Sequence, residues 1–305
     1  MQIFYTDTFV LPLPKGHKFP MTKYERVRES LLSQNIVAPE HLQIPRAATS
    51  QELLDAHCPE YVHRVLEGKL TDKETRRIGF PWSKAMVERS LRSVGATLEA
   101  TEAALKYGLG INLAGGTHHG FTDRGEGFCV FNDVVVASRQ IQKQRQNSKI
   151  LIIDCDVHQG NGTAAMTEEA DSIFTFSIHG AKNYPYHKYP SDLDIALPDG
   201  TGDEEYLQEL EQALQNISAR FEPDLVFYLA GADPYMHDRF GRLGLTKQGL
   251  QERDHCVFSW CEGHQIPLVI TMAGGYAEEI SDIVEIHVST IRSALKQFKF
   301  NAVHL

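Results

Sequence analysis

The stretch 150–162 reads Ile-Leu-Ile-Ile-Asp-Cys-Asp-Val-His-Gln-Gly-Asn-Gly and decides how the rest of the chain is interpreted. Its four apolar residues have the character of a buried strand, and Asp154, Asp156 and His158 then follow at alternate positions. Alternate side chains of an extended segment point to the same side. Two carboxylates and an imidazole are costly to bury together unless a cation binds them. The stretch therefore predicts a metal site at a strand end, the alternative being that these side chains only cap the following helix.

The same pattern recurs along the chain: apolar runs of strand length end in glycines or polar residues. These runs predict strands over 110–114, 150–153, 172–178, 225–230 and 267–272. Apolar residues at helical spacing predict helices over 82–107, 132–144, 203–221, 246–262 and 279–298. Alternating strands and helices favour a parallel sheet covered on both faces, with ligands bound beyond the carboxyl ends of its strands. No repeat or linker interrupts the pattern, which predicts a single domain, 1–305.

Composition excludes several classes of protein. The net charge of −10 leaves no basic excess for binding nucleic acid. No apolar stretch approaches the roughly 18 residues of a membrane span, and the N-terminus lacks the features of a signal peptide. The five cysteines include no Cys-x-x-Cys pair, which argues against disulfides and thiolate zinc sites. We therefore expect a cytoplasmic protein with no membrane or nucleic-acid partner; its oligomeric state stays open.

A metal site needs a ligand besides Asp156 and His158, and Asp233 follows another predicted strand. Three protein ligands with a fourth position for water are typical of catalytic zinc, although the same donors also suit Fe²⁺, Co²⁺ or Mn²⁺. Taken alone, Asp233 before Pro234 would be interpreted as a helix cap.

The adjacent pair His118 and His119 follows a predicted strand and a Gly-Gly turn. A hydrolase needs a base for the attacking water and an acid for the leaving amine. Imidazoles oriented by Asp154 and Asn161 can fill both roles. The alternative is a solvated pair of loop histidines.

Tyr276 and Phe128 each follow glycine. Tyr276 can donate its hydroxyl to an oxyanion or can simply pack. Phe128 is either a core residue or the wall of a channel to the metal. The predicted channel consists of Gly127, Phe128, Gly274 and Gly275.

Five motifs, in this order, resemble the histone deacetylase family and cover the chain to about residue 290. They are Gly-Gly-Thr-His-His (115–119), Gly-Glu-Gly-Phe-Cys-Val-Phe-Asn-Asp (125–133), Asp-Cys-Asp-Val-His-Gln-Gly-Asn-Gly-Thr (154–163), Ala-Gly-Ala-Asp-Pro (230–234) and Ala-Gly-Gly-Tyr (273–276). The resemblance implies the arginase/deacetylase fold, an αβα arrangement of three layers with a central, mostly parallel sheet of about eight strands.

The resemblance also implies roles for individual residues. It implies zinc at Asp156, His158 and Asp233, a dyad of His118 and His119 in which the second histidine is the general base and acid, and transition-state stabilisation by Tyr276. It further implies a monovalent cation, usually K⁺, bound in part through backbone carbonyls by the following residues: Asp154, Asp156, His158, Ser177 and Ile178.

Within the family, the chain is most similar to class IV deacetylases and their bacterial relatives. Gln159 stands where classes I and II commonly have a second histidine, and Asp-Arg-Gly at 123–125 has class IV character. The stretch 78–83 offers no match for the rim aspartate of class I enzymes. The loop 180–191 is rich in tyrosine (184, 186 and 189). Since class IV relatives are associated with long fatty acyl groups, removal of such groups is an alternative to deacetylation.

The sequence thus predicts a zinc-dependent amidohydrolase that removes acyl groups from the Nε of lysine in a protein or peptide. Three alternatives remain: hydrolysis of acetylpolyamines or other small acylated amines, acyl-lysine binding without turnover, and an arginase-like enzyme with two metal ions.

Overall fold

Eight strands form one parallel sheet in the order β2-β1-β3-β8-β7-β4-β5-β6. The computed structural model describes residues 2–298, so residues 1 and 299–305 of the predicted domain lie outside the described residues. The strands are β1 (Gln2–Phe4), β2 (Leu42–Gln43), β3 (Leu109–Asn112), β4 (Ile150–Asp154), β5 (Ile173–Gly180), β6 (Leu193–Leu197), β7 (Leu225–Leu229) and β8 (Leu268–Thr271).

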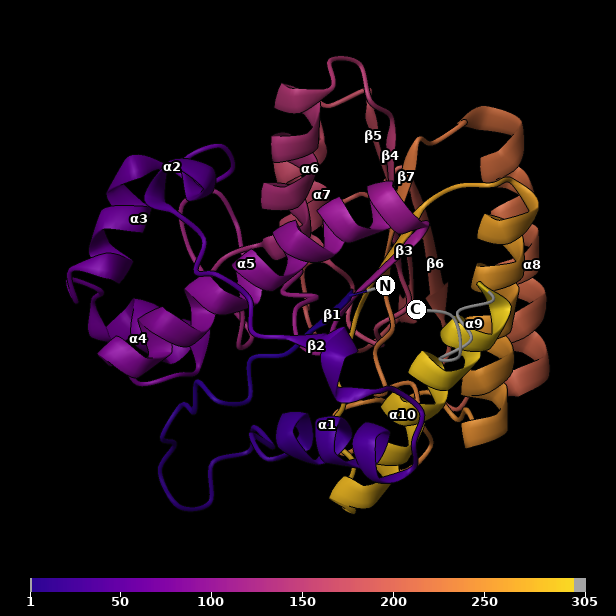
Figure 1. Ribbon diagram of the computed structural model, residues 1–305, viewed down its shortest axis with the longest axis horizontal. Coiled ribbons are helices and arrows are strands. Elements are labelled where there is room, and N and C mark those ends of the chain that lie inside the picture. The colour runs from indigo at the N-terminus through magenta and orange to yellow at the C-terminus, as the bar shows by residue number, and fades with distance from the viewer. Residues whose placement is uncertain (1, 299–305) are drawn as a thin grey trace.

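Helices cover both faces of this sheet (Figure 1). The helices are α1 (Lys23–Ser33), α2 (Ser50–Leu53), α3 (Pro59–Leu66), α4 (Asp72–Ile78), α5 (Lys84–Tyr107), α6 (Asp133–Gln144), α7 (Asn161–Thr167), α8 (Asp203–Arg220), α9 (Lys247–Gly263) and α10 (Ile280–Gln297), with a short 3₁₀ helix at Pro39–His41. Figure 1 shows α8 and α9 on the side of the sheet opposite to α6 and α7.

The alternation of side chains along β4 explains the three layers. Ile150 and Ile152 pack into the core that contains the apolar side chains of α5 and α6. Leu151 and Ile153 point the other way, into the core shared with α8, α9 and α10. All four side chains are buried, and each contributes about 1.5–3 kcal/mol by leaving water. A strand that is apolar on both faces is typical of a parallel sheet between helices.

The predicted fold class is confirmed, and the described sheet is entirely rather than mostly parallel. All five predicted strands and all five predicted helices are present, with ends within two residues of those expected. The prediction did not include β1, β2, β6, α1–α4 and α7, most of which are too short to show a period. The described part of the chain contains no helix that is both long and apolar enough to cross a membrane.

The strand order brings distant loops to one edge. Strands β3, β8, β7 and β4 are neighbours in the sheet, and all run in the same direction. The loops that follow them therefore meet at the carboxyl edge, although the loops after β3 and β8 lie more than a hundred residues apart in sequence.

Candidate metal centre

Three side chains at this carboxyl edge form the one group in residues 2–298 that could hold a metal ion. The group comprises Asp156 and His158 after β4 and Asp233 after β7, with ligand atoms within 4.8 Å of one another. His158 Nδ1 lies 2.9 Å from Asp156 Oδ1 and 3.2 Å from Asp233 Oδ2. All three residues are buried, so water does not screen their charges.

Backbone donors fix the two carboxylates but leave one oxygen free. Asp156 accepts hydrogen bonds from the backbone N–H of His158 (2.9 Å) and of Gly274 (2.8 Å). Asp233 Oδ1 accepts from the N–H of Val157 at 3.0 Å. Asp233 Oδ2 is buried and accepts no hydrogen bond of ordinary geometry among the described residues, although His158 Nδ1 lies 3.2 Å away. A buried, unpartnered carboxylate oxygen is costly unless a cation coordinates it, so the donor set fits a divalent metal.

The charges of the cluster lead to the same conclusion. Burial opposes a proton on His158, but its contacts with Asp156 and Asp233 outweigh this effect and raise the pKa of His158 to about 10. Burial, together with the charge of Asp156, raises the pKa of Asp233 to about 7. His158 and Asp233 thus hold protons at pH values at which free His and Asp side chains release them. This shows that the cluster is stabilised by added positive charge.

A glycine is required at position 274, where the loop that leads to Tyr276 passes over these carboxylates. A Cβ atom at Gly274 would lie only 1.9 Å from Asp233 Oδ2 and 2.6 Å from Asp156 Oδ2. Any other residue at 274 would displace the carboxylates.

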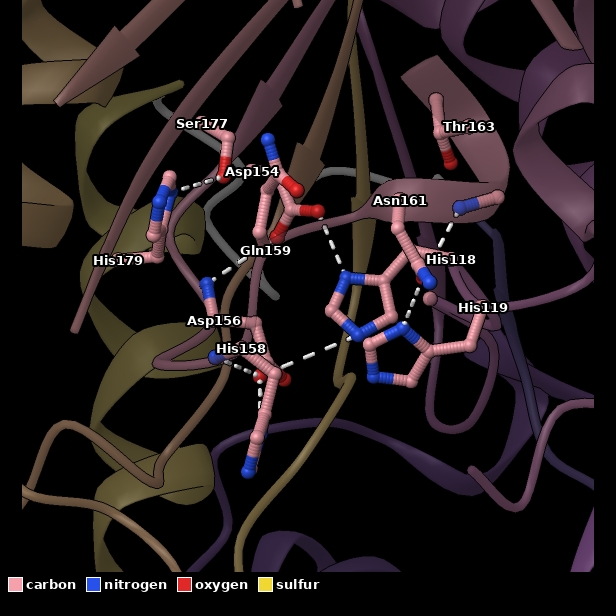
Figure 2. A network of polar contacts seen from close by, with 12 residues as sticks. His118, His119, Asp154, Asp156, His158, Gln159, Asn161, Thr163, Ser177 and His179 are labelled. Atoms are coloured by element: carbon pink, nitrogen blue, oxygen red, sulfur yellow. Dashed lines mark hydrogen bonds and ion pairs between the residues drawn. The ribbon is translucent and has the colours of Figure 1, made fainter. Parts of the chain in front are cut away.

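The two adjacent histidines lie side by side next to the cluster, with ring centroids 4.1 Å apart (Figure 2). His118 Nδ1 donates to Asp154 Oδ2 at 2.7 Å, and His119 Nδ1 donates to Asn161 Oδ1 at 2.6 Å. His118 Nε2 lies 3.9 Å from Asp156 Oδ1. The structure thus places beside each histidine the partner that the sequence suggested, and it leaves Nε2 of His119 as the nitrogen with a free lone pair.

The partners give the two imidazoles opposite protonation preferences. Burial opposes protonation of His118, but Asp154 and Asp156 outweigh it and raise the pKa of His118 to about 9. Burial, followed by the charges of His118 and His158, holds the pKa of His119 well below its ordinary value. Near neutral pH, His118 is cationic and His119 is neutral.

Tyr276 lies close to His158, with ring centroids 6.4 Å apart. Its backbone is held at both ends by two neighbours that the sequence did not reveal. Asp238 Oδ2 accepts from the N–H of Tyr276 at 2.6 Å, and Arg239 Nε donates to its carbonyl at 2.8 Å. No local sequence pattern marks Asp238 and Arg239 as neighbours of residue 276, because only the fold brings them there.

A cavity of about 470 Å³ runs past these groups. Gly127, Phe128, Gly274 and Tyr276 belong to its wall. Phe128 has a φ of 68°, which a non-glycine residue adopts only when its surroundings hold it there, and its N–H donates to the carbonyl of Ile78 at 2.7 Å.

The inclusion of Gly275 in the predicted channel was wrong. Gly275 is not among the cavity-lining residues, and a Cβ at this position would meet the side chains of Ile283 and Ala232. Its φ of 142° explains why a glycine stands there.

The residues predicted to bind a monovalent cation lie on two neighbouring strand ends. Ser177 of β5 pairs in register with Asp154 of β4. Figure 2 shows that the carboxylate of Asp154 contacts His118 of the dyad, whereas Ser177 lies beside His179. Ser177 Oγ also lies 3.0 Å from His179 Nδ1. The side chain of Ile178 is buried in the core, so this residue can offer only backbone oxygen.

Comparisons with known proteins identify the family. The family model of the histone deacetylase domain matches residues 17–291. An uncharacterized protein of Picosynechococcus sp. is 42% identical over 96% of this chain and 97% of its own length. Histone deacetylase 2 of Arabidopsis thaliana is 29% identical over 92% of this chain and 76% of its own length. The acetoin utilization protein AcuC of Staphylococcus aureus is 27% identical over 85% of this chain and 72% of its own length.

The fold is found in solved structures as well. The crystal structure of a histone deacetylase homologue from Aquifex aeolicus superposes with a TM-score of 0.83 and 24% identity over 98% of this chain and 88% of that chain. The architecture is therefore the αβα fold of arginases and deacetylases. The extent of the family match shows more: the chain belongs to the histone deacetylase family, whose members are hydrolases.

Proposed function

We propose that the protein is a zinc-dependent amidohydrolase of class IV character that removes acyl groups from the Nε of lysine or from a similar acylated amine. One observation carries the proposal: two adjacent buried histidines, one cationic and one neutral, lie beside a cluster of Asp, His and Asp at the wall of a cavity. A deacetylase-family relative from Arabidopsis supports the reaction class.

Asp156, His158 and Asp233 are proposed to hold the ion, Zn²⁺ first, with Fe²⁺ or Co²⁺ as substitutes. A bound divalent ion polarises the acyl carbonyl and makes water a better nucleophile near neutral pH. One cluster of three ligands in residues 2–298 supports one such ion per chain, in contrast to the two of an arginase-like enzyme.

His119 is proposed as the general base and acid. Since Asn161 fixes the Nδ1 proton, Nε2 of His119 is the atom that accepts a proton from the attacking water and then delivers it to the leaving amine. His118 stays protonated on Asp154 and stabilises the negative charge that develops in the transition state.

Tyr276 is proposed to donate its hydroxyl to the oxyanion. Burial, followed by the charges of Asp233 and Asp156, raises its pKa well above the ordinary value, so the proton remains available at any working pH. Gly127, Phe128 and Gly274 line the path of the acyl-lysine stem and exclude water. The K⁺ site at Asp154, Asp156, His158, Ser177 and Ile178 is proposed to steady the β4 and β5 ends.

We further propose a single domain and a cytoplasmic location, which fits five free cysteines. Acyl-lysine binding without turnover is the weaker function, because it predicts the loss of a ligand, of the dyad or of the tyrosine, and none of these side chains is missing. Acetylpolyamines and long-chain acyl groups remain alternative substrates to be tested directly.

The decisive experiment incubates purified protein, loaded with zinc, with lysine peptides that carry acyl groups from acetyl to myristoyl, and with an acetylpolyamine. We expect hydrolysis of at least one peptide by the wild type and none by Asp233→Ala, whose metal content is measured in parallel. Full metal content and activity in Asp233→Ala would refute the ligand assignment. Hydrolysis of the acetylpolyamine but of none of the peptides would show that the substrate is a small acylated amine and not acyl-lysine in a peptide.

A further inference from the structure

The mouth of the cavity has the opposite charge to the rest of the molecule. Five arginine or lysine side chains line the cavity, and one of them, Arg89 on α5, is buried. The other four are exposed at the mouth: Arg77 on α4, Lys182 after β5, and Arg239 and Arg242 after β7. In the part of the chain that the structure describes, Asp156 is the one carboxylate in the cavity wall, and it belongs to the metal cluster. The whole chain nevertheless carries a net charge of −10.

Salt bridges neutralise only one side of this mouth. On one side, Glu126 lies 3.3 Å from Arg77 and 2.9 Å from Arg124. Arg124 in turn pairs with Asp123 at 2.9 Å, so these two arginines and two carboxylates balance. This side of the mouth is electrically neutral.

The other side is not balanced. Asp199 is shared between Lys182 at 3.5 Å and Arg242 at 3.3 Å, so one carboxylate faces two cations. Arg239 donates to the carbonyls of Tyr276 and Lys18 and has no carboxylate partner among residues 2–298. Lys182, Arg239 and Arg242 thus share one carboxylate partner, so two cations lack one among the described residues. The nearby Asp238 accepts hydrogen bonds from backbone N–H groups instead. Lys182 and Arg242 are 72% and 54% exposed and therefore available to a ligand.

We infer that the substrate carries a negatively charged group, a carboxylate or a phosphate, next to the acylated amine. The inference rests on the proposed function, because it concerns the part of the substrate that stays outside the cavity. Cationic side chains around an entrance speed the approach of anions and repel cations. The mouth therefore favours an acyl-lysine in an acidic sequence and disfavours acetylpolyamines and lysine-rich segments. Tyr186, 86% exposed and also at the mouth, offers an aromatic face to the backbone of such a peptide.

The test uses three acetyl-lysine peptides of equal length, in which the acetylated residue is flanked by two Asp, two Ser or two Lys residues on each side. We expect kcat/KM to follow the order Asp, Ser, Lys. Since one exposed charge pair changes binding by about two- to fivefold, two unbalanced cations predict about a tenfold advantage of the Asp over the Ser peptide at low salt. In 0.5 M NaCl the gap should largely close. A phosphoserine-flanked peptide and free Nε-acetyl-lysine distinguish a phosphate and the α-carboxylate from acidic side chains.

The matched variant is Lys182→Gln combined with Arg242→Gln, with Lys106→Gln as control. Lys106 lies at the end of α5, just before β3 begins, and so on the amino edge of the sheet. The double variant should lose the preference for the Asp peptide while cleaving the Ser peptide at the wild-type rate, and the control should behave like wild type. Equal rates for all three peptides, a fastest Lys peptide, or an unchanged preference in the double variant would overturn the inference.

Affinities of the same peptides, fluorescently labelled and measured by anisotropy, keep the two proposals apart. Tighter binding of the Asp peptide that is lost in the double variant, without hydrolysis of any peptide, would refute the proposed function and support the charge preference. Hydrolysis whose rate and affinity do not depend on the flanking charge would support the proposed function and refute the charge preference.

Discussion

A buried arginine underneath the metal cluster offers a sharp test of how the site is supported. Arg253 on α9 is fully buried, and its Nη1 donates to the carbonyl of Gly231 at 2.6 Å and to that of Cys155 at 3.3 Å. These carbonyls belong to the loops that carry Asp233 and Asp156. The guanidinium is also paired with Asp254 at 2.7 Å. Arg253 therefore connects the two ligand loops, and we consider the variant Arg253→Met.

The expected loss of stability follows from what the substitution leaves behind. Two carbonyls lose their charged donor, and the carboxylate of Asp254 stays buried with only the hydroxyls of Tyr228 and Thr290, both at 2.5 Å. Removing one partner of a buried ion pair costs about 3–5 kcal/mol. Converting Asp254 to Asn in the same protein removes the stranded charge, so the double variant should be more stable than Arg253→Met.

Urea unfolding provides the assay. A loss of about 4 kcal/mol lowers the midpoint by roughly 1–2 M for a chain of this size. Because the ligand loops lose their connection, zinc affinity, measured by competition with a chelating dye, should fall about 10–100-fold. Arg292→Met is the control, since Arg292 is exposed and its one side-chain hydrogen bond among the described residues goes to Gln34. A midpoint shift no larger than that of the control would refute the stability argument, and unchanged zinc affinity would refute the role in holding the loops.

Three further predictions concern single side chains. Tyr276→Phe should lower kcat by about 10²–10³ with zinc content unchanged, as measured by steady-state kinetics and metal analysis; an undiminished kcat would remove the tyrosine from the mechanism. Asn161→Asp gives His119 a charged partner that raises its pKa, so the acid limb of the pH–rate profile should move to higher pH, and an unmoved limb would speak against His119 as the base. Burial lowers the pKa of His57 to about 4 from an ordinary 6.5. Between these pH values the unfolded chain binds a proton that the folded one does not, so stability should fall by about 3 kcal/mol as pH drops from 6.5 to 4. His57→Gln should remove this contribution and make the slope shallower in urea titrations, while the other buried histidines keep theirs.

Sequence reasoning works for this chain where the information is local. Asp156 and His158 are two residues apart on one strand end, so their proximity follows from the geometry of an extended chain. The long helices and buried strands likewise have enough residues to show a period. The sheet order is different. β3 and β4 follow each other among the strands along the chain, yet β8 and β7 lie between them.

Residues that act through tertiary contacts cannot be predicted from local sequence either, because their contact partners lie far away along the chain. Lys23 is buried, and its Nζ lies 3.3 Å from the carbonyl of Ala273 and 3.4 Å from that of Gly275, some 250 residues away. Nothing around Lys23 in the sequence distinguishes it from a surface lysine at a helix start. Gly275 shows the opposite error. The sequence predicted a channel-lining role for it, because it precedes Tyr276 in a motif, but in the structure this glycine allows the turn and does not line the channel.

The two adjacent histidines show why the fold, and not residue type, assigns chemistry at this site. His118 and His119 are both buried, and each donates Nδ1–H to an oxygen 2.6–2.7 Å away. The difference lies in that oxygen: Asp154 brings a negative charge, whereas Asn161 brings a neutral dipole. A charged partner stabilises the imidazolium, and a neutral one leaves desolvation to disfavour it. Two chemically identical side chains thus have pKa values shifted in opposite directions, and the sheet edge that positions their partners is what separates them.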